Sequence, residues 1–221
     1  MFLRSHPDLS SVRGSLLLGK GVRGWYLSNL QPFEELFVRL RMPPIVLTYA
    51  QVVVSIMSAV AYAAGLIYAA GFIVLCTGTL DILDGKVARR LNVGSRRVAF
   101  LDSVIDRYAE FFGYVGLIIF FGSGWVVWAI LLAMLGGMMV SYTRARAEGL
   151  GLCCEVGLLQ RPERIVVLGF GSIFSSVAVH TFGGQHQLLV LTITVLAVLS
   201  NITAVQRIIH TSRQLDGEAN G

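Results

Sequence analysis

The chain has 221 residues, of which 55% are hydrophobic and only 14% are charged, and its mean hydropathy is +0.70. A soluble domain carries about a quarter charged residues, so this composition excludes an ordinary soluble protein and indicates an integral membrane protein. The net charge of +5 does not indicate nucleic-acid binding, because the basic residues cluster beside apolar segments and no recognition motif is present. Anionic lipid headgroups and phosphorylated substrates fit this charge better.

The chain begins with an arm, residues 1–28, whose mixture of basic residues, glycines and short apolar runs predicts no firm structure. The next residues predict a short helix that Asn29 caps and that has Pro32 in its first turn. Its apolar side chains share one face, which is typical of a helix lying in the membrane interface. The alternative is packing against a soluble partner, but a membrane span follows directly. We therefore assign residues 1–43 to an arm and an interfacial helix.

Long uncharged stretches then predict six transmembrane helices, at about 20 residues for each span. The expected spans are two within residues 42–80 with a turn near Gly65–Gly71, a third over Val98–Phe121, a fourth over about Trp125–Tyr142, and two within Ile165–Gln206 that are broken at Gly183–Gly184. The sequence thus predicts an all-α membrane domain over residues 44–212 and a polar tail over residues 213–221.

The basic residues predict the orientation of these spans. All 18 Lys and Arg lie in the two chain ends and in the loops after the second and fourth helices, when the adjoining helix ends and Arg107 are counted with them. The three opposite turns contain none. By the positive-inside rule, both termini and the two basic loops are cytoplasmic.

Four aspartates lie on this cytoplasmic side, at the end of the second span and the start of the third. Asp81 and Asp84 are three residues apart and Asp102 and Asp106 are four apart, so each pair shares one helix face. Carboxylates beside hydrocarbon repel each other and require a compensating cation. Carboxylate-only sites suit Mg2+ or Mn2+, which also bind substrate phosphates. A single pair of this kind would more simply be a solvated helix end.

The segment closely resembles the signature D-x2-D-G-x2-A-R-x8-G-x3-D-x3-D of the CDP-alcohol phosphatidyltransferases. The matching residues are Asp81, Asp84, Gly85, Ala88, Arg89, Asp102 and Asp106. Val98 departs from the signature, because the family has glycine at that position. The resemblance implies a metal-dependent enzyme that transfers a phosphatidyl-type group from CDP-diacylglycerol, or an ether analogue, to a hydroxyl and releases CMP.

The resemblance also implies roles for the matched residues. Asp81, Asp84 and Asp102 would be the principal ligands of Mg2+ or Mn2+, with Asp106 near a second ion. Asp106 would also take the proton of the attacking hydroxyl. The CDP-lipid would be bound by Asp81, Gly85, Ala88 and Arg89.

A second polar group lies at the end of the fourth span and the start of the fifth. It contains Ser141, Arg144, Arg146, Arg161 and Arg164. Arginines at this depth can be plain membrane anchors, and that explanation serves at least equally well for Arg146, Arg161 and Arg213. Arginines that converge from several helices can instead bind a phosphate monoester.

The motifs S-Y-x-[KR]-A-R-A-E and R-P-E-R resemble the inositol-phosphate branch of the same family, the phosphatidylinositol-phosphate and archaetidylinositol-phosphate synthases. This resemblance implies that Ser141, Arg144 and Arg164 bind the acceptor phosphate, and Arg207 is a further candidate by position. Inositol 1-phosphate is then the expected acceptor. The alternatives are glycerol 3-phosphate as acceptor and, in a different class, a transporter or a non-catalytic membrane module. The family resemblance also implies a homodimer in the inner membrane of a prokaryotic cell.

Two further expectations concern residues outside these motifs. Glu110, one turn beyond Asp106, either shapes the site or pairs with an arginine. His180 and His186 lie near the turn on the opposite face and are expected to be interfacial side chains, not ligands.

Overall fold

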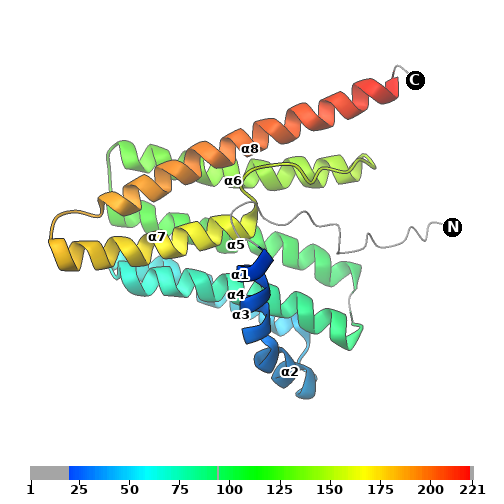
Figure 1. Ribbon diagram of the computed structural model, residues 1–221, viewed down its shortest axis with the longest axis horizontal. Coiled ribbons are helices and arrows are strands. Elements are labelled where there is room, and N and C mark those ends of the chain that lie inside the picture. Colours follow the sequence, from blue (N-terminus) through cyan, green and yellow to red (C-terminus); the bar gives the residue numbers. More distant parts are fainter. Residues whose placement is uncertain (1–19, 94, 220–221) are drawn as a thin grey trace.

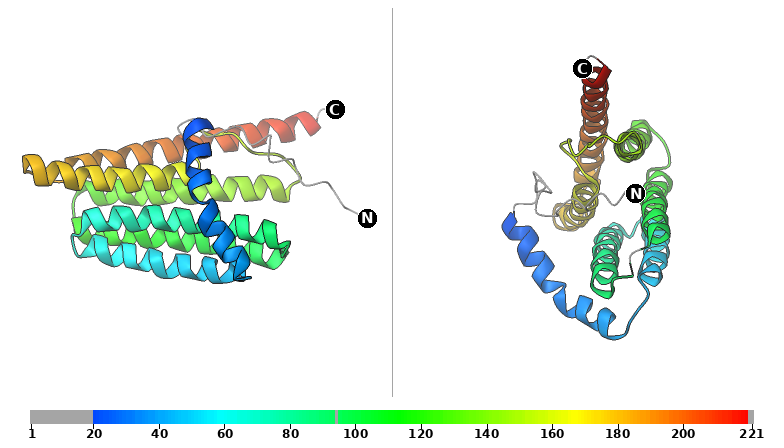
Figure 2. Two further views of the ribbon diagram at one scale, coloured as in Figure 1. Left: turned by 60° about the horizontal axis from the view of Figure 1, so that its bottom comes forward. Right: turned by 90° about the vertical axis from the view of Figure 1, so that its right-hand side faces the viewer.

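The computed structural model describes residues 20–93 and 95–219, and within these ranges the regular structure is helical throughout (Figure 1). The helices are α1 (Lys20–Asn29), α2 (Gln31–Arg39), α3 (Pro44–Ala63), α4 (Ile67–Leu91), α5 (Arg96–Phe121), α6 (Trp125–Gly149), α7 (Arg161–Phe182) and α8 (Gln187–Ala219). Helices α3 to α8 run along the bundle, whereas α1 and α2 cross its side (Figure 2).

Two expectations about the N-terminal region are wrong. Lys20–Asn29 forms helix α1, although its sequence predicted no firm structure. The N-cap position of α2 is occupied by Leu30, not Asn29, and no side chain caps the helix. Pro32 does lie in its first turn, where a missing N–H costs nothing. Tertiary contact explains α1, because the Tyr26 hydroxyl lies 2.6 Å from Oγ1 of Thr79 in α4.

Five of the described helices, namely α3, α4, α6, α7 and α8, are long and apolar enough to cross a membrane. Helix α5 is comparable in length, but it carries the charged residues Asp102, Asp106, Arg107 and Glu110 and so fails the same test of composition. The break expected at Gly183–Gly184 is present between α7 and α8.

Several boundaries differ from those expected. The turn after α3 is confined to residues 64–66, so Gly71 lies inside α4. A Cβ on Gly71 would lie 2.7 Å from the carbonyl oxygen of Gly169 in α7, so the two glycines allow these helices to touch. Helix α6 continues past Tyr142 to Gly149, and α8 continues to Ala219 through most of the expected polar tail.

Packing brings the charged helix ends together. Helix α3 contacts both α4 and α5, α6 lies along α8, and α7 contacts both α4 and α8. Ser95 caps α5, and a reciprocal capping box of Gln160 and Glu163 begins α7. Helices α4 and α6 end and α5 begins at the same end of the bundle, whereas α7 begins nearer the middle of its length (Figures 1 and 2).

Candidate active site

Three carboxylates from two helices meet at this end of the bundle. Asp81 of α4 and Asp102 and Asp106 of α5 each offer one ligand oxygen, and these oxygens lie within 4.8 Å of one another. Oδ1 of Asp102 is buried and has no hydrogen-bond partner among the described residues. A buried carboxylate oxygen without a partner, beside two further carboxylates, fits a hard divalent cation with oxygen ligands.

Asp84 lies beside this group but outside the 4.8 Å set. Its side chain is buried, and its Oδ2 accepts a 3.2 Å hydrogen bond from Oγ1 of Thr48 in α3. Its charge is close enough to those of Asp81 and Asp102 for the three carboxylates to repel one another. Its expected place among the principal metal ligands therefore stays a prediction.

Helix α3 supplies a second contact that the motifs did not reveal. Gln51 is fully buried, and its Nε2 donates a 3.0 Å hydrogen bond to Oδ1 of Asp106. Thr48 and Gln51 are three residues apart and therefore share one face of α3. Polar side chains at this spacing in a span without charged residues were the available signal in the sequence.

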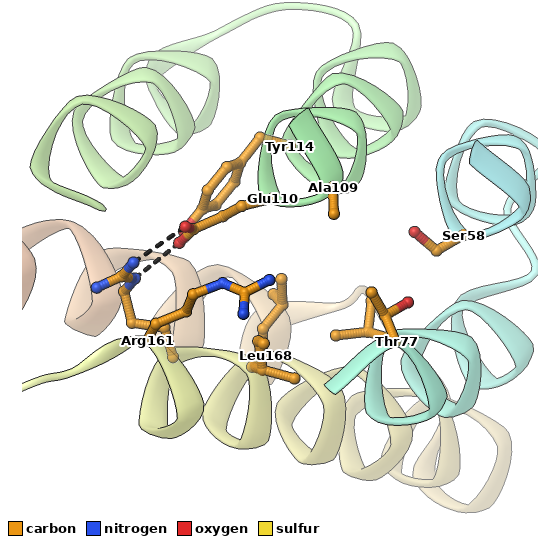
Figure 3. Close-up of a pocket in the computed structure, with 11 residues that line it drawn as sticks. Ser58, Thr77, Ala109, Glu110, Tyr114, Arg161 and Leu168 are labelled. Carbon is orange, nitrogen blue, oxygen red and sulfur yellow. Dashed lines mark hydrogen bonds and ion pairs between the residues drawn. The ribbon is translucent and has the colours of Figure 1, made fainter. Parts of the chain in front are cut away.

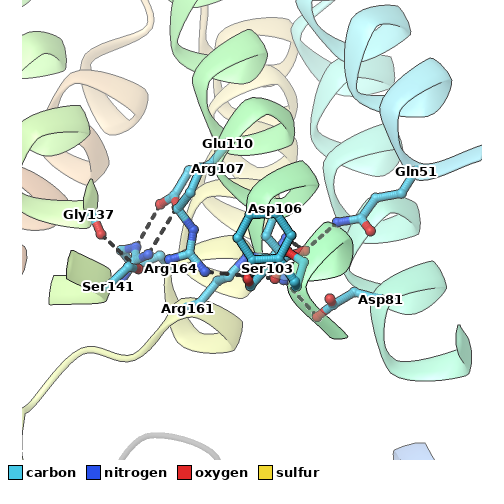
Figure 4. A network of polar contacts seen from close by, with 11 residues as sticks. Gln51, Asp81, Ser103, Asp106, Arg107, Glu110, Gly137, Ser141, Arg161 and Arg164 are labelled. Carbon is cyan, nitrogen blue, oxygen red and sulfur yellow. Dashed lines mark hydrogen bonds and ion pairs between the residues drawn. The ribbon is translucent and has the colours of Figure 1, made fainter. Parts of the chain in front are cut away.

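Arg161 of α7 lies inside the acidic cluster, so the explanation of Arg161 as a membrane anchor is wrong. Its Nη1 is 2.8 Å from Oδ2 of Asp81, and its Nη2 is 2.6 Å from Oδ1 of Asp106 (Figure 4). Only 12% of the Arg161 side chain is exposed. Because α7 packs closely against α4, the Arg161 guanidinium lies within reach of carboxylates on α4 and α5.

Glu110 pairs with an arginine, which is one of its two expected roles. Arg164 donates from Nε and Nη2 to the two carboxylate oxygens of Glu110, at 2.7 and 3.0 Å. Arg164 is 2% exposed, and its Nη1 is buried with no partner among the described residues. A Cβ on Gly137 of α6 would lie 2.9 Å from Oε1 of Glu110, so a glycine at that position leaves room for the pair.

The other three expected acceptor residues have internal partners. Ser141 donates to the carbonyl oxygen of Gly137, and Arg144 pairs with Glu148 at 2.8 Å. Arg207 is buried and donates to two backbone carbonyl oxygens, those of Val156 at 2.8 Å and Val140 at 2.6 Å. The charges of Arg144 and Arg164 are still close enough to repel that of Arg207. The three arginines therefore form one positive region.

The residues expected to bind the CDP-lipid lie along the last turns of α4. A Cβ on Gly85 would meet no atom within 4 Å, so the space in front of this backbone is open. Ala88 is half-buried and Arg89 is exposed. Val98, which replaces the family glycine, is half-buried in the first turn of α5, and its backbone N–H donates to the Ser95 cap.

A cavity of about 40 Å³ lies among α3, α4, α5 and α7 (Figure 3). Its polar lining residues are Ser58, Thr77, Glu110, Tyr114, Arg161 and Arg164. This volume is enough for two or three water molecules at about 15 Å³ each. The cavity therefore gives the two arginines room on the side away from the aspartates.

The two histidines lie at the opposite end of the bundle, in and after the last turn of α7. Nδ1 of His186 is 3.1 Å from Oγ of Ser175, and burial lowers the pKa of His186. His180 is exposed. Their position away from the acidic cluster agrees with their expected lack of a role as ligands.

Comparisons with known proteins agree with this geometry. The family model described as CDP-alcohol phosphatidyltransferase matches residues 41–211. The chain is 33% identical over 194 residues to the archaetidylinositol phosphate synthase of Methanothermobacter thermautotrophicus, covering 86% of this chain and 95% of the relative. It is 34% identical over 191 residues to the phosphatidylinositol phosphate synthase of Mycobacteroides abscessus, covering 84% of each chain.

The fold is also similar to solved structures of a phosphatidylinositol phosphate synthase. The crystal structure of Mycobacterium tuberculosis phosphatidylinositol phosphate synthase with CDP-DAG bound has a TM-score of 0.72 and 29% identity, and the match covers 81% of this chain and 92% of that chain. A structure of the same enzyme in complex with manganese and citrate has a TM-score of 0.72 and 30% identity, with 81% and 87% of the two chains covered.

Proposed function

The chain belongs to the CDP-alcohol phosphatidyltransferase family, and from this premise we propose that it transfers the phosphatidyl-type group of a CDP-lipid to a hydroxyl of inositol 1-phosphate. CMP is the second product. The observation that carries this proposal is the position of buried Arg164, whose Nη1 has no partner among the described residues, at the same end of the bundle as the acidic cluster. One end of the bundle then offers a place for a cation and a separate place for a phosphate monoester.

Asp81, Asp102 and Asp106 would hold Mg2+ or Mn2+, and Asp84 would contribute to a second ion. The bound ions would neutralise the pyrophosphate of the donor as the bond to CMP breaks. The CDP-lipid would lie along Gly85, where the backbone is open. Exposed Arg89 would bind the nucleotide phosphate of the leaving CMP.

Asp106 is the proposed base for the acceptor hydroxyl. Its Oδ1 already accepts a hydrogen bond from Gln51 and forms an ion pair with Arg161. Among the described residues, the other oxygen, Oδ2, has only a long 3.9 Å contact with Arg107. Gln51 would therefore orient the carboxylate so that Oδ2 can take the proton while the hydroxyl attacks the lipid-side phosphorus.

The acceptor phosphate would bind Nη1 of Arg164. Glu110 holds the rest of this guanidinium in a bidentate pair, so Nη1 points in a fixed direction. Ser141, Arg144 and Arg207 would complete the phosphate site from α6 and α8. Arg144 can join it at low cost, because its present ion pair with Glu148 is solvent-exposed.

The proposed membrane arrangement adds α5 to the five apolar helices as a sixth span. Asp106 and Glu110 of α5 are engaged inside the protein by Gln51 and Arg164, so their charges need not face lipid. Helices α1 and α2 would lie in the cytoplasmic interface of a prokaryotic inner membrane. This arrangement keeps the lipid chains in hydrocarbon while the headgroup meets a water-soluble acceptor.

The test is CMP release by the purified protein in lipid nanodiscs with CDP-diacylglycerol and Mg2+. Inositol 1-phosphate, inositol, glycerol 3-phosphate and serine are offered separately. Release with inositol 1-phosphate alone is the expected result. Release with glycerol 3-phosphate alone would support the proposed role of the aspartates but show that the proposed acceptor is wrong. No CMP release with any of the acceptors, from either CDP-diacylglycerol or an ether-linked donor, would overturn the proposal. A transporter would place its ionisable groups nearer the bilayer midplane, on broken helices.

A further inference from the structure

Arg161 is bonded to two of the three carboxylates that make up the acidic cluster. The bonds go to different helices, with Nη1 bound to Asp81 of α4 and Nη2 bound to Asp106 of α5. Both distances, 2.8 and 2.6 Å, are those of charge-assisted hydrogen bonds. The third carboxylate, Asp102, keeps a buried oxygen with no partner among the described residues.

A divalent cation bound to the same three carboxylates would use oxygens of Asp81 and Asp106, and the negative charge of both is already neutralised in part by Arg161. A carboxylate oxygen that accepts a short guanidinium hydrogen bond is a poorer cation ligand, and two positive charges at this distance in a half-buried site repel each other. The cation and Arg161 therefore oppose each other at Asp81 and Asp106.

The structure also provides a place for Arg161 to move. The guanidinium borders the cavity of about 40 Å³, whose lining also includes Glu110, which attracts it, and Arg164, which is paired with Glu110 and repels it. Nε of Arg161 is buried and has no partner among the described residues, so only Asp81 and Asp106 hold the head group. Loss of these two contacts would not leave the charge in hydrocarbon.

We propose that Arg161 is an internal competitor of the divalent cation and thereby couples cation binding to donor binding. This inference rests on the proposed metal site of the phosphatidyltransferase. The cation alone binds weakly because it must displace Arg161 from Asp81 and Asp106. The CDP-lipid brings a pyrophosphate that accepts the displaced guanidinium, so the cation and the donor each raise the affinity for the other.

The experiment measures Mn2+ binding to the protein in phosphatidylcholine nanodiscs, from the electron paramagnetic resonance signal of free Mn2+, without acceptor and without turnover. Arg161→Met should bind Mn2+ about tenfold more tightly than the wild type. CDP-diacylglycerol should then strengthen Mn2+ binding less in Arg161→Met than in the wild type.

Arg107→Met is the matched control, because it also removes one positive charge near Asp106 but only at 3.9 Å. Its Mn2+ affinity should rise less than that of Arg161→Met. Arg161→Lys keeps the charge without the two-pronged contact and should lie between the wild type and Arg161→Met, so it carries the test if Arg161→Met does not fold.

Unchanged or weaker Mn2+ binding in Arg161→Met would overturn the inference, as would an equal gain in Arg107→Met, because that would reveal only a general effect of charge. Absence of Mn2+ binding in every form of the protein would also overturn it. The measurement involves no acceptor, so failure of inositol 1-phosphate in the CMP assay would leave its outcome unaffected.

Discussion

At the scale of single residues, the site is held by hydrogen bonds that limit which oxygen of each carboxylate can react. Asp106 is the clearest case, because Gln51 and Arg161 both engage its Oδ1. Arg164 is a similar case among the arginines, since Glu110 binds its Nε and Nη2 and leaves Nη1. Three predictions follow from these two arrangements.

Asp106→Asn should reduce kcat by about a thousandfold, because an amide cannot accept the acceptor's proton and general bases contribute in this range. The same change should affect CDP-lipid binding less than Asp84→Asn does. Steady-state CMP release and equilibrium binding of CDP-diacylglycerol check the two parts. An equal loss of donor binding in both variants would contradict the division of roles.

Gln51→Leu should lower kcat about tenfold with little change in either KM, because it removes a buried donor to Asp106 that substrates do not contact. Ser55→Ala is the control. Ser55 lies one turn further along α3, is equally buried, and donates only to the carbonyl oxygen of Val52. A similar loss of kcat in both variants would indicate general damage to α3, and a rise in KM alone would assign Gln51 to binding.

Arg164→Ala should raise the KM for inositol 1-phosphate about 10- to 100-fold and the KM for the donor far less, because hydrogen bonds to charged groups are worth about 1.5–3 kcal/mol. Glu110→Gln should shift the acceptor KM in the same direction by a smaller factor, since it weakens the pair that orients Arg164. An unchanged acceptor KM in Arg164→Ala would remove Arg164 from the acceptor site.

At the scale of elements, a buried charge in α2 joins this helix to the last turns of α4, where the CDP-lipid is proposed to bind. Glu34 is 4% exposed, and its two oxygens bind Nζ of Lys86 at 2.9 Å and Nε of Arg90 at 2.6 Å. Lys86 directly follows Gly85 of the signature. The pair therefore holds the proposed interfacial helix against the turns that would bind the CDP-lipid.

Glu34→Gln should lower the apparent melting temperature in detergent and raise the KM for the CDP-lipid. Removing one partner of a buried ion pair costs about 3–5 kcal/mol, and exposure of Arg90 reduces this to roughly 1–3. Glu35→Gln is the matched control, because the side chain of the adjacent Glu35 is 45% exposed and its contact with Arg39 is long, at 3.9 Å. Its melting temperature should stay near that of the wild type, and equal losses in the two variants would contradict the role of Glu34.

At the scale of the whole molecule, the order of the helices places all the site residues at one end. In the proposed membrane arrangement α5 crosses the bilayer although it carries charged residues, and a span of mixed character is stable only where its charges have partners inside the bundle. The expected homodimer stays a prediction that size-exclusion chromatography with light scattering can test.

The crossing of α5 can be tested by labelling cysteines in intact cells with a membrane-impermeant maleimide. The variants are Val93→Cys before α5 and Ser123→Cys after it, in a chain whose exposed Cys76 and Cys153 are replaced by serine. Both positions are exposed in the structure. Ser123→Cys should react in intact cells and Val93→Cys only after permeabilisation. The same accessibility at both positions would show that α5 does not span.

The amino-acid sequence by itself determined the membrane character, the family, the aspartate signature and the succession of apolar helices, because these depend on composition and on spacing along one helix. It did not determine that Lys20–Asn29 is helical, since that helix depends on contacts such as the one between Tyr26 and Thr79. It also did not decide whether Glu110 shapes the site or pairs with an arginine, or whether Arg161 is a membrane anchor or part of a phosphate site.

Only the tertiary structure decided which charges are partners. Arg161 bonds to residues 80 and 55 positions earlier in the chain, and Gln51 meets Asp106 across 55 positions. No local pattern encodes such pairs. They depend on how closely α4 and α7 approach at Gly71 and Gly169, and on which face of α3 turns toward α5. Charge–charge energies depend steeply on distance and burial. An arginine at the lipid border would be a solvated anchor, whereas Arg161, inside the bundle, is a competitor for the metal site.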